Sequence, residues 1–147
     1  MRALVLATLL LATSAWAADM TPPPEIQPAA VDPLAAPRRL IAAKDWAGAL
    51  AALRAQPQAA SADWHNLMGY TLRKQATPQF AEAESQYLEA LRIDPGHRGA
   101  NEYLGELYVM TGELAKARER LVVLEKLCPN GCEQRADLQR AIAAAGK

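Results

Sequence analysis

The 147-residue chain is poor in aromatic residues, which make up 5% of it and include one Phe, and it has few Val and Ile. The scarcity of aromatic and β-branched residues disfavours sheet, and abundant Ala and Leu favour helix. The charged residues balance to a formal net charge of zero. Without a basic excess, we expect no nucleic-acid-binding surface.

Motifs that carry known chemistry are also missing. No serine stands in a Gly-x-Ser-x-Gly context, and no phosphate loop, dinucleotide fingerprint or His-Glu-x-x-His sequence occurs. Glu82 and Glu84 fall on different faces of a helix and form no catalytic pair. His65 and His97 are the only histidines, and no Cys/His cluster supplies a further metal ligand. We therefore expect a protein that is not an enzyme and uses no metal or cofactor.

The first 17 residues have the pattern of an export signal. Arg2 precedes an apolar run from Ala3 to Ala12 that is too short to span a bilayer. Ala15-Trp16-Ala17 has the small-x-small form of a cleavage site. We predict a Sec signal peptide cleaved after Ala17 and a periplasmic or secreted mature protein with no stable membrane span. An uncleaved membrane anchor is the alternative.

Residues 18–36 predict a disordered linker rather than part of a domain. They contain five prolines mixed with Ala, a composition that favours extended chain and cannot bury a core. Ordered structure is expected to start near Pro37, which suits the first turn of a helix. A single domain over residues 37–145 follows.

The two cysteines, Cys128 and Cys132, flank Pro129-Asn130-Gly131. This insert favours a tight turn, and an oxidising compartment allows the thiols to pair. We expect a structural disulfide that fixes the last helix to the one before it. A redox-active or metal-handling pair is the alternative, although the spacing differs from the C-x-x-C of thioredoxin-like sites and the C-x-x-C-H of haem attachment.

Residues 98–129 carry a helix–turn–helix pattern. The small residues Gly105 and Ala117 are placed where two helices would cross closely, and Gly112 breaks the chain between them. Pro129 stops the second helix. Large apolar residues fill the space around the crossing, namely Leu104, Tyr108, Leu121 and Leu124.

The same pattern recurs with a period of 34 residues. Three pairs of equivalent residues are 34 apart: Pro95 and Pro129, Ala83 and Ala117, and Tyr87 and Leu121. The spacing resembles the tetratricopeptide repeat (TPR), whose pattern is W-x2-L-G-x2-Y, then A-x3-F, then P. The Leu-Gly-Glu-Leu-Tyr and Cys-Pro-x-Gly-Cys-Glu segments resemble those of small exported bacterial TPR proteins.

This resemblance implies an all-α, right-handed superhelical array of helix–turn–helix repeats. Residues 61–95 and 98–129 would form two repeats, residues 37–57 a degenerate one, and residues 133–145 a capping helix with a polar outer side. In the middle repeat, Ser61 is a candidate N-cap of the first helix. Thr77-Pro78 is the expected start of the second helix.

The resemblance also implies a function. In TPR proteins the first helix of each repeat lines a concave groove that binds peptides or protein segments. Asn66 and Arg73 could hydrogen-bond a peptide, and Glu102 with Glu106 would favour a basic segment. The residues that match the groove-facing positions are Asn66, Tyr70, Arg73, Lys74, Glu102, Glu106 and Met110, with Asp63 and Val109 beside them.

We therefore expect a non-enzymatic protein-binding scaffold of the bacterial envelope. A solvated helix face without a ligand is the simpler interpretation of each single groove residue. At the level of the whole protein, the alternative is a periplasmic thiol-redox or metal-handling accessory protein that uses Cys128 and Cys132. Self-association through the ends of so short an array is a further possibility.

Overall fold

A computed structural model describes residues 32–146 of the chain. The predicted signal peptide and most of the predicted linker lie outside these residues. The described part is entirely helical apart from its turns and loops, and it contains no strand. Its seven helices are α1 (Ala35–Ala42), α2 (Trp46–Ala55), α3 (Ala62–Arg73), α4 (Phe80–Ile93), α5 (Arg98–Met110), α6 (Leu114–Leu127) and α7 (Glu133–Ala145).

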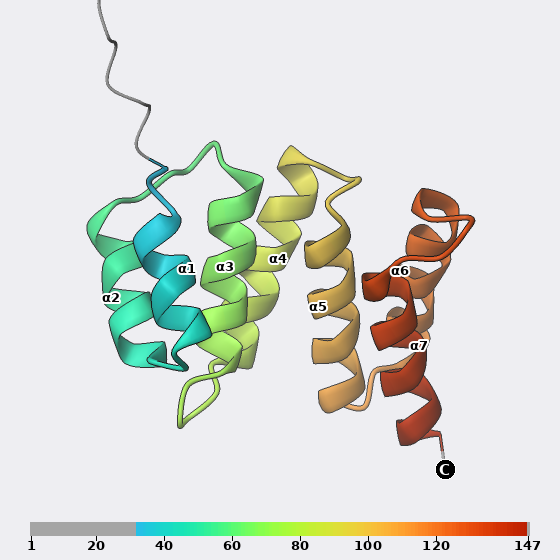
Figure 1. The fold of residues 1–147 in the computed structure, drawn as a ribbon. Coiled ribbons are helices and arrows are strands. Elements are labelled where there is room, and N and C mark those ends of the chain that lie inside the picture. Colours follow the sequence, from blue (N-terminus) through green and yellow to red (C-terminus); the bar gives the residue numbers. More distant parts are fainter. Residues whose placement is uncertain (1–31, 147) are drawn as a thin grey trace, which may run out of the picture. The chain divides into compact units, whose positions relative to one another are not determined.

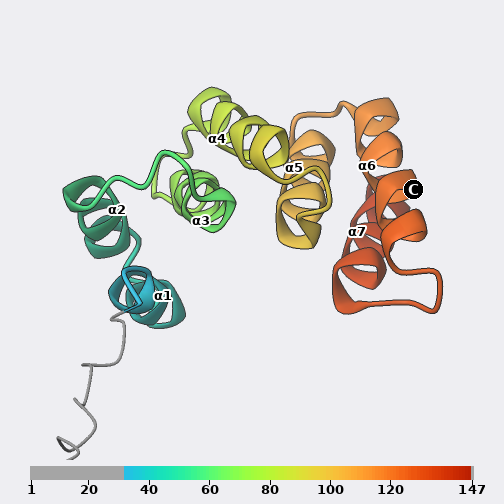
Figure 2. The ribbon, with the colours of Figure 1, turned by 90° about the horizontal axis from the view of Figure 1, so that it is seen from above.

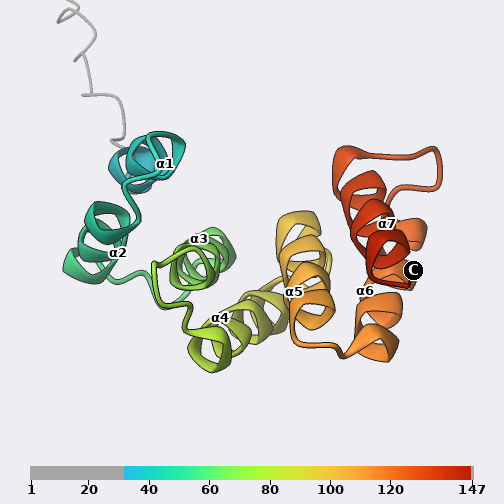
Figure 3. The ribbon, with the colours of Figure 1, turned by 90° about the horizontal axis from the view of Figure 1, so that it is seen from below.

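The helices stack as pairs in chain order (Figure 1). Seen from above and from below, α1, α3, α5 and α7 follow one side of a curved row, and α2, α4 and α6 follow the other (Figures 2 and 3). We call the side formed by the odd-numbered helices the inner side. The all-α repeat array is thus confirmed, while the hand of its superhelix stays a prediction.

Local sequence explains where the helices begin. The side chain of Ser61 accepts a hydrogen bond from the backbone N–H of Trp64 at 3.2 Å, so the predicted N-cap of α3 is confirmed. Asp45 caps α2 in the same way through Gly48 N–H at 2.9 Å. His97 caps α5, because its Nδ1 accepts from Ala100 N–H at 3.0 Å.

Two predicted starts differ from the structure. The second helix of the middle repeat begins at Phe80 with Gln79 as its N-cap, not at Thr77-Pro78. The N–H of Gln79 donates to the carbonyl of Leu72 near the end of α3 at 3.2 Å, which holds the chain in a turn up to that residue. The ordered domain also starts earlier than Pro37, since α1 begins at Ala35 and Leu34 is buried in the core.

The core is a continuous apolar cluster that runs through the stacked helices. Its fully buried large side chains are Leu53, Leu72, Tyr87, Leu104, Leu107, Leu124 and Leu138. Trp64 links two repeats, because its indole N–H donates to the carbonyl of Leu53 at 3.1 Å. Gly112 has a φ of +82°, the left-handed conformation expected of the residue that ends α5.

Candidate functional site

Two tyrosines from neighbouring inner-side helices meet at the centre of the array. The rings of Tyr70 on α3 and Tyr103 on α5 have centroids 4.7 Å apart, and both residues remain partly exposed. Trp46 of α2 approaches Tyr70 edge-on at 6.0 Å. The sequence analysis singled out Tyr70 but gave no role to Tyr103 or Trp46.

Arg73 ties this aromatic pair to a carboxylate. Its side chain is 3% exposed, and its Nη2 donates to Oε2 of Glu106 at 2.7 Å. The guanidinium carbon lies 5.5 Å from the ring centroids of both Tyr70 and Tyr103, within the range of cation–π attraction. Burial lowers the pKa of Arg73, but the nearby Tyr87 and Glu106 raise it above its ordinary value, so the group stays charged.

We call Tyr70, Arg73, Tyr103 and Glu106 the α3–α5 cluster. Because an ion pair and stacked rings hold its members together, the cluster has a defined geometry before any partner arrives. It also changes the role expected of Arg73. The guanidinium is committed to Glu106 within the fold instead of standing free on the surface, and helix periodicity could not reveal this contact between α3 and α5.

Two other residues predicted to face a ligand are covered. Asn66 is 7% exposed, and its side-chain nitrogen lies against the backbone of Gly99 on α5. Glu102 is 6% exposed. Each was placed on the correct kind of helix, but the next helix of the stack covers it. Burial of this kind depends on contacts between repeats, which the spacing within one repeat does not specify.

The remaining predicted residues are accessible. Lys74 is exposed, with its Nζ 5.6 Å from the centre of the Tyr70 ring. Met110 is 55% exposed and its sulfur lies 3.7 Å from Nη1 of Arg73. Asp63 is exposed and accepts hydrogen bonds from Arg38 of α1 and from His97 of α5, which joins three inner-side helices.

Glu102 has acidic surroundings. Burial, and then the negative charges of Glu106, Asp137 and Glu133, raise the pKa of this carboxyl to about 7, while Arg73 acts in the opposite direction. Glu133 and Asp137 belong to α7, which packs against α5. The sequence analysis treated α7 only as a polar-backed cap, so these two acidic residues were missed.

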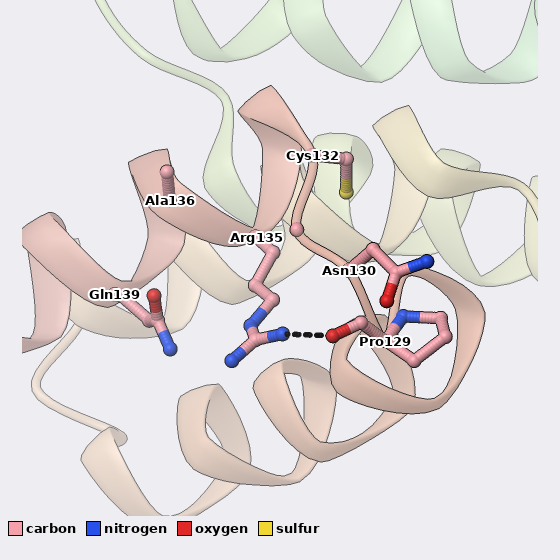
Figure 4. Close-up of a pocket in the computed structure, with 7 residues that line it drawn as sticks. Pro129, Asn130, Cys132, Arg135, Ala136 and Gln139 are labelled. Atoms are coloured by element: carbon pink, nitrogen blue, oxygen red, sulfur yellow. Dashed lines mark hydrogen bonds between the residues drawn. The ribbon is translucent and has the colours of Figure 1, made fainter.

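Cys128 and Cys132 form a disulfide at the turn before α7, with their Cα atoms 5.8 Å apart. Cys128 is buried and Cys132 is partly exposed. Arg135 secures the turn, because its Nη1 donates to the carbonyls of Cys128 at 3.2 Å and Pro129 at 3.4 Å (Figure 4). A surface hollow of about 340 Å³ lies over this turn, lined by Pro129, Asn130, Gly131, Cys132, Arg135, Ala136 and Gln139.

Metal-binding arrangements were searched for among residues 32–146. In this range, no three His, Cys, Asp or Glu side chains gather as the ligands of a metal ion would. Both histidines have structural partners: His65 contacts Gln86 and the Ala59 carbonyl, and His97 contacts Asp63. None of the helices in the described part of the chain is both long and apolar enough to cross a bilayer.

No family model matches the chain. Two curated proteins of Arabidopsis thaliana are similar to it: a TPR repeat-containing thioredoxin, TTL4, and an inactive TPR repeat-containing thioredoxin, TTL3. Each is 39% identical to this chain over 66 residues, which are 44% of this chain. The chain spans only 9% of the length of these relatives.

The helices are tetratricopeptide repeats. Their stacking in pairs, their 34-residue period and the similarity to proteins named for this repeat agree. Within the TPR pattern, Gly69 and Gly105 are equivalent, so Asn66 is equivalent to Glu102 and Tyr70 to Glu106. The α3–α5 cluster is therefore built from residues that the two repeats do not share.

Proposed function

We propose that this TPR array is a non-catalytic binding module that holds a peptide or an extended protein segment against its inner side. The observation that carries the proposal is the α3–α5 cluster. Two partly exposed tyrosine rings lie 4.7 Å apart at the centre of the array. Aromatic side chains fixed in this way provide a large contact area, and little entropy is lost when a partner binds them.

The exposed neighbours of the cluster suit the same role. Lys74 lies over the Tyr70 ring and supplies a mobile cation, while Met110 supplies a flexible apolar surface. A partner segment lying across α3 and α5 would contact both residues and the two rings. No catalytic arrangement is part of this proposal, because the cluster offers shape, charge and aromatic surface rather than a nucleophile with a base.

The location of the protein is also proposed, as the bacterial envelope or the exterior. The support comes from the signal-like first 17 residues and from the disulfide between Cys128 and Cys132, which an oxidising compartment would preserve. Detection of a mature N-terminus at Ala18 in a periplasmic fraction would test it. A full-length protein retained in the cytoplasm would contradict it.

A fully random library of 12-residue peptides tests the binding function when it is selected against the full chain. Enriched peptides are then synthesised and their affinities are measured for the wild type and for Tyr70→Ala. We expect a loss of about tenfold or more, as for an aromatic residue at the centre of an interface. Helicity measured by circular dichroism should not change.

Leu88→Ala is the matched control for this experiment. Leu88 is a large side chain on α4, outside the inner row, and it is 48% exposed. Its removal should leave peptide affinity unchanged. Equal affinity of the selected peptides for the wild type and Tyr70→Ala would rule out the α3–α5 cluster as the binding site.

Thiol–disulfide exchange at Cys128–Cys132 is the second candidate function. Cys132 is partly exposed and borders the hollow at the start of α7, and both plant relatives are named thioredoxins. The similarity covers only 9% of each relative, however, and one of the two is named inactive. The two cysteines are also separated by three residues rather than the two of thioredoxin-like sites.

Thiol labelling of the full chain across glutathione buffers separates the two candidates. A structural disulfide should have a reduction potential below about −300 mV and resist the glutathione couple. A value within the range of exchange proteins, about −270 to −120 mV, would favour the redox function instead.

A further inference from the structure

Glu102 is a carboxylate without a partner at the α5–α7 junction. Its residue is 6% exposed, and within residues 32–146 no group donates a hydrogen bond or forms a salt bridge to it. Burying an ionised carboxylate without a partner is costly, and such groups are normally paired. The unpaired state of Glu102 is therefore the least satisfied feature of the inner side.

The surrounding charges increase the cost. Glu106 and Arg73 face Glu102 from α5 and α3, but these two are already paired with each other at 2.7 Å. Asp137 on α7 is paired with Arg140. Glu133, also on α7, has no cationic partner among the described residues. Glu102 and Glu133 thus leave two uncompensated negative charges where α5 and α7 meet.

We propose that an arginine side chain of the bound segment occupies the α5–α7 junction and pairs with Glu102 and Glu133. This inference rests on the proposed peptide-binding function and specifies its partner. A guanidinium can donate two parallel hydrogen bonds to one carboxylate. It can also stack on an aromatic face, and Tyr103 precedes Leu104 on the same helix as Glu102, next to it in the chain.

The α3–α5 cluster shows the same chemistry within the fold. There, Arg73 pairs with Glu106 and lies over Tyr70 and Tyr103. Glu102 and Glu133 provide carboxylates for a second guanidinium, but the described chain supplies none. Helix α7 would then be part of the recognition surface as well as the cap of the array.

The charge of Glu102 should make binding depend on pH. Its pKa is raised to about 7 by burial and by Glu106, Asp137 and Glu133. Below that pH the carboxyl gains a proton and loses its attraction for a cation, so affinity for an arginine-containing peptide should fall from pH 8 to pH 6. Paired Arg73, Glu106 and Asp137 face the same site, and Glu133 adds its charge from α7.

The test uses the peptides selected from the random library against the full chain. We expect the enriched sequences to share an arginine, and Glu102→Gln to weaken their binding about 10- to 100-fold at pH 8, as for the loss of a charged hydrogen-bond partner. Replacing the shared arginine by citrulline, which has the same shape but no charge, should have a similar effect. Glu125→Gln, an exposed substitution on α6, is the matched control and should change nothing.

The outcomes separate this inference from the function on which it rests. Peptides that need Tyr70 but lack a shared arginine, or that bind Glu102→Gln as tightly as the wild type, would overturn the arginine site and leave the peptide-binding function standing. If no selected peptide depends on Tyr70, both are overturned. Glu102→Gln removes a buried charge and should fold at least as well as the wild type, so a loss of binding is not explained by unfolding.

Discussion

The middle and last repeats use an equivalent glycine in different ways. A Cβ atom on Gly69 of α3 would stand 2.8 Å from the ring of Tyr87 and 3.0 Å from the carbonyl oxygen of Ala83, both on α4. At Gly105 of α5, the nearest atoms would be Cδ2 and Cδ1 of Leu138, at 2.5 and 2.7 Å. The middle repeat is therefore closed by its own second helix, whereas the last repeat is closed by α7.

The residue four positions after the buried alanine differs between the two repeats. In the middle repeat it is Tyr87, which is fully buried, and in the last repeat it is Leu121, which is only partly buried. With the smaller side chain at this position, the space over Gly105 is filled by Leu138 of α7. The last repeat thus depends on the cap for packing, and the Glu102 site depends on it for Glu133.

Leu138→Ala should have the largest effect on this arrangement. Leu138 is fully buried, and removal of such a side chain destabilises by about 2–5 kcal/mol through lost burial and a new cavity. Urea unfolding of the full chain measures the loss. Because stability in repeat arrays is partly local, hydrogen exchange should increase more in α5 and α7 than in α3 and α4.

Leu127→Ala is the control for this comparison, since Leu127 is 40% exposed and its loss should change stability little. Equal increases of exchange in the middle repeat and in α5 and α7 would contradict the dependence of the last repeat on its cap.

Substitution of each glycine by alanine tests the two closures directly. Overpacking costs about 1–3 kcal/mol, so both Gly69→Ala and Gly105→Ala should be destabilising. Leu138→Ala makes room for a Cβ at Gly105, and the double variant Gly105→Ala/Leu138→Ala should therefore be more stable than the sum of the two losses predicts.

The control pair is Gly69→Ala/Leu138→Ala, because at Gly69 the neighbours are Tyr87 and a backbone carbonyl that Leu138 does not affect. Its two losses should add. Additivity in both double variants, measured by urea unfolding, would show that Leu138 does not fill the space over Gly105 in solution.

Features set within one repeat could be predicted from the sequence. The N-cap at Ser61 and the break at Gly112 follow from short-range chemistry, and both are present in the structure. The 34-residue period identified the equivalent second helices because one repeat unit recurs. These features depend on neighbours a few residues away in the chain, which the sequence displays directly.

Features that depend on contacts between helices of different repeats were not predictable. Helical periodicity placed Arg73 on the inner helix, but its pairing with Glu106 joins residues 33 positions apart. Gly105 was expected to lie at the crossing of α5 with α6, and its closest neighbour is Leu138 of α7. The early start of the domain was missed because the burial of Leu34 also depends on the stacked helices.

Glu102→Gln should give the smallest change, and one of opposite sign. The equivalent residue in the middle repeat is the neutral Asn66, so this variant makes the last repeat resemble the middle one. The pKa of Glu102 is about 7 in the folded chain, above its ordinary value of 4.5. The folded state therefore holds this proton more tightly than the unfolded state, and native stability declines as pH rises from about 4.5 to 7.

Above pH 7 this loss is complete, so Glu102→Gln should be more stable than the wild type by about 1–2 kcal/mol at pH 8 and about equal to it at pH 4.5. Urea unfolding at both pH values measures the difference, with Glu125→Gln as the exposed control. A gain that is the same at both pH values would show that the carboxylate charge is not its cause. A gain confined to high pH would mean that the last repeat retains a destabilising charge that the middle repeat lacks, as expected of a residue kept for binding a cation.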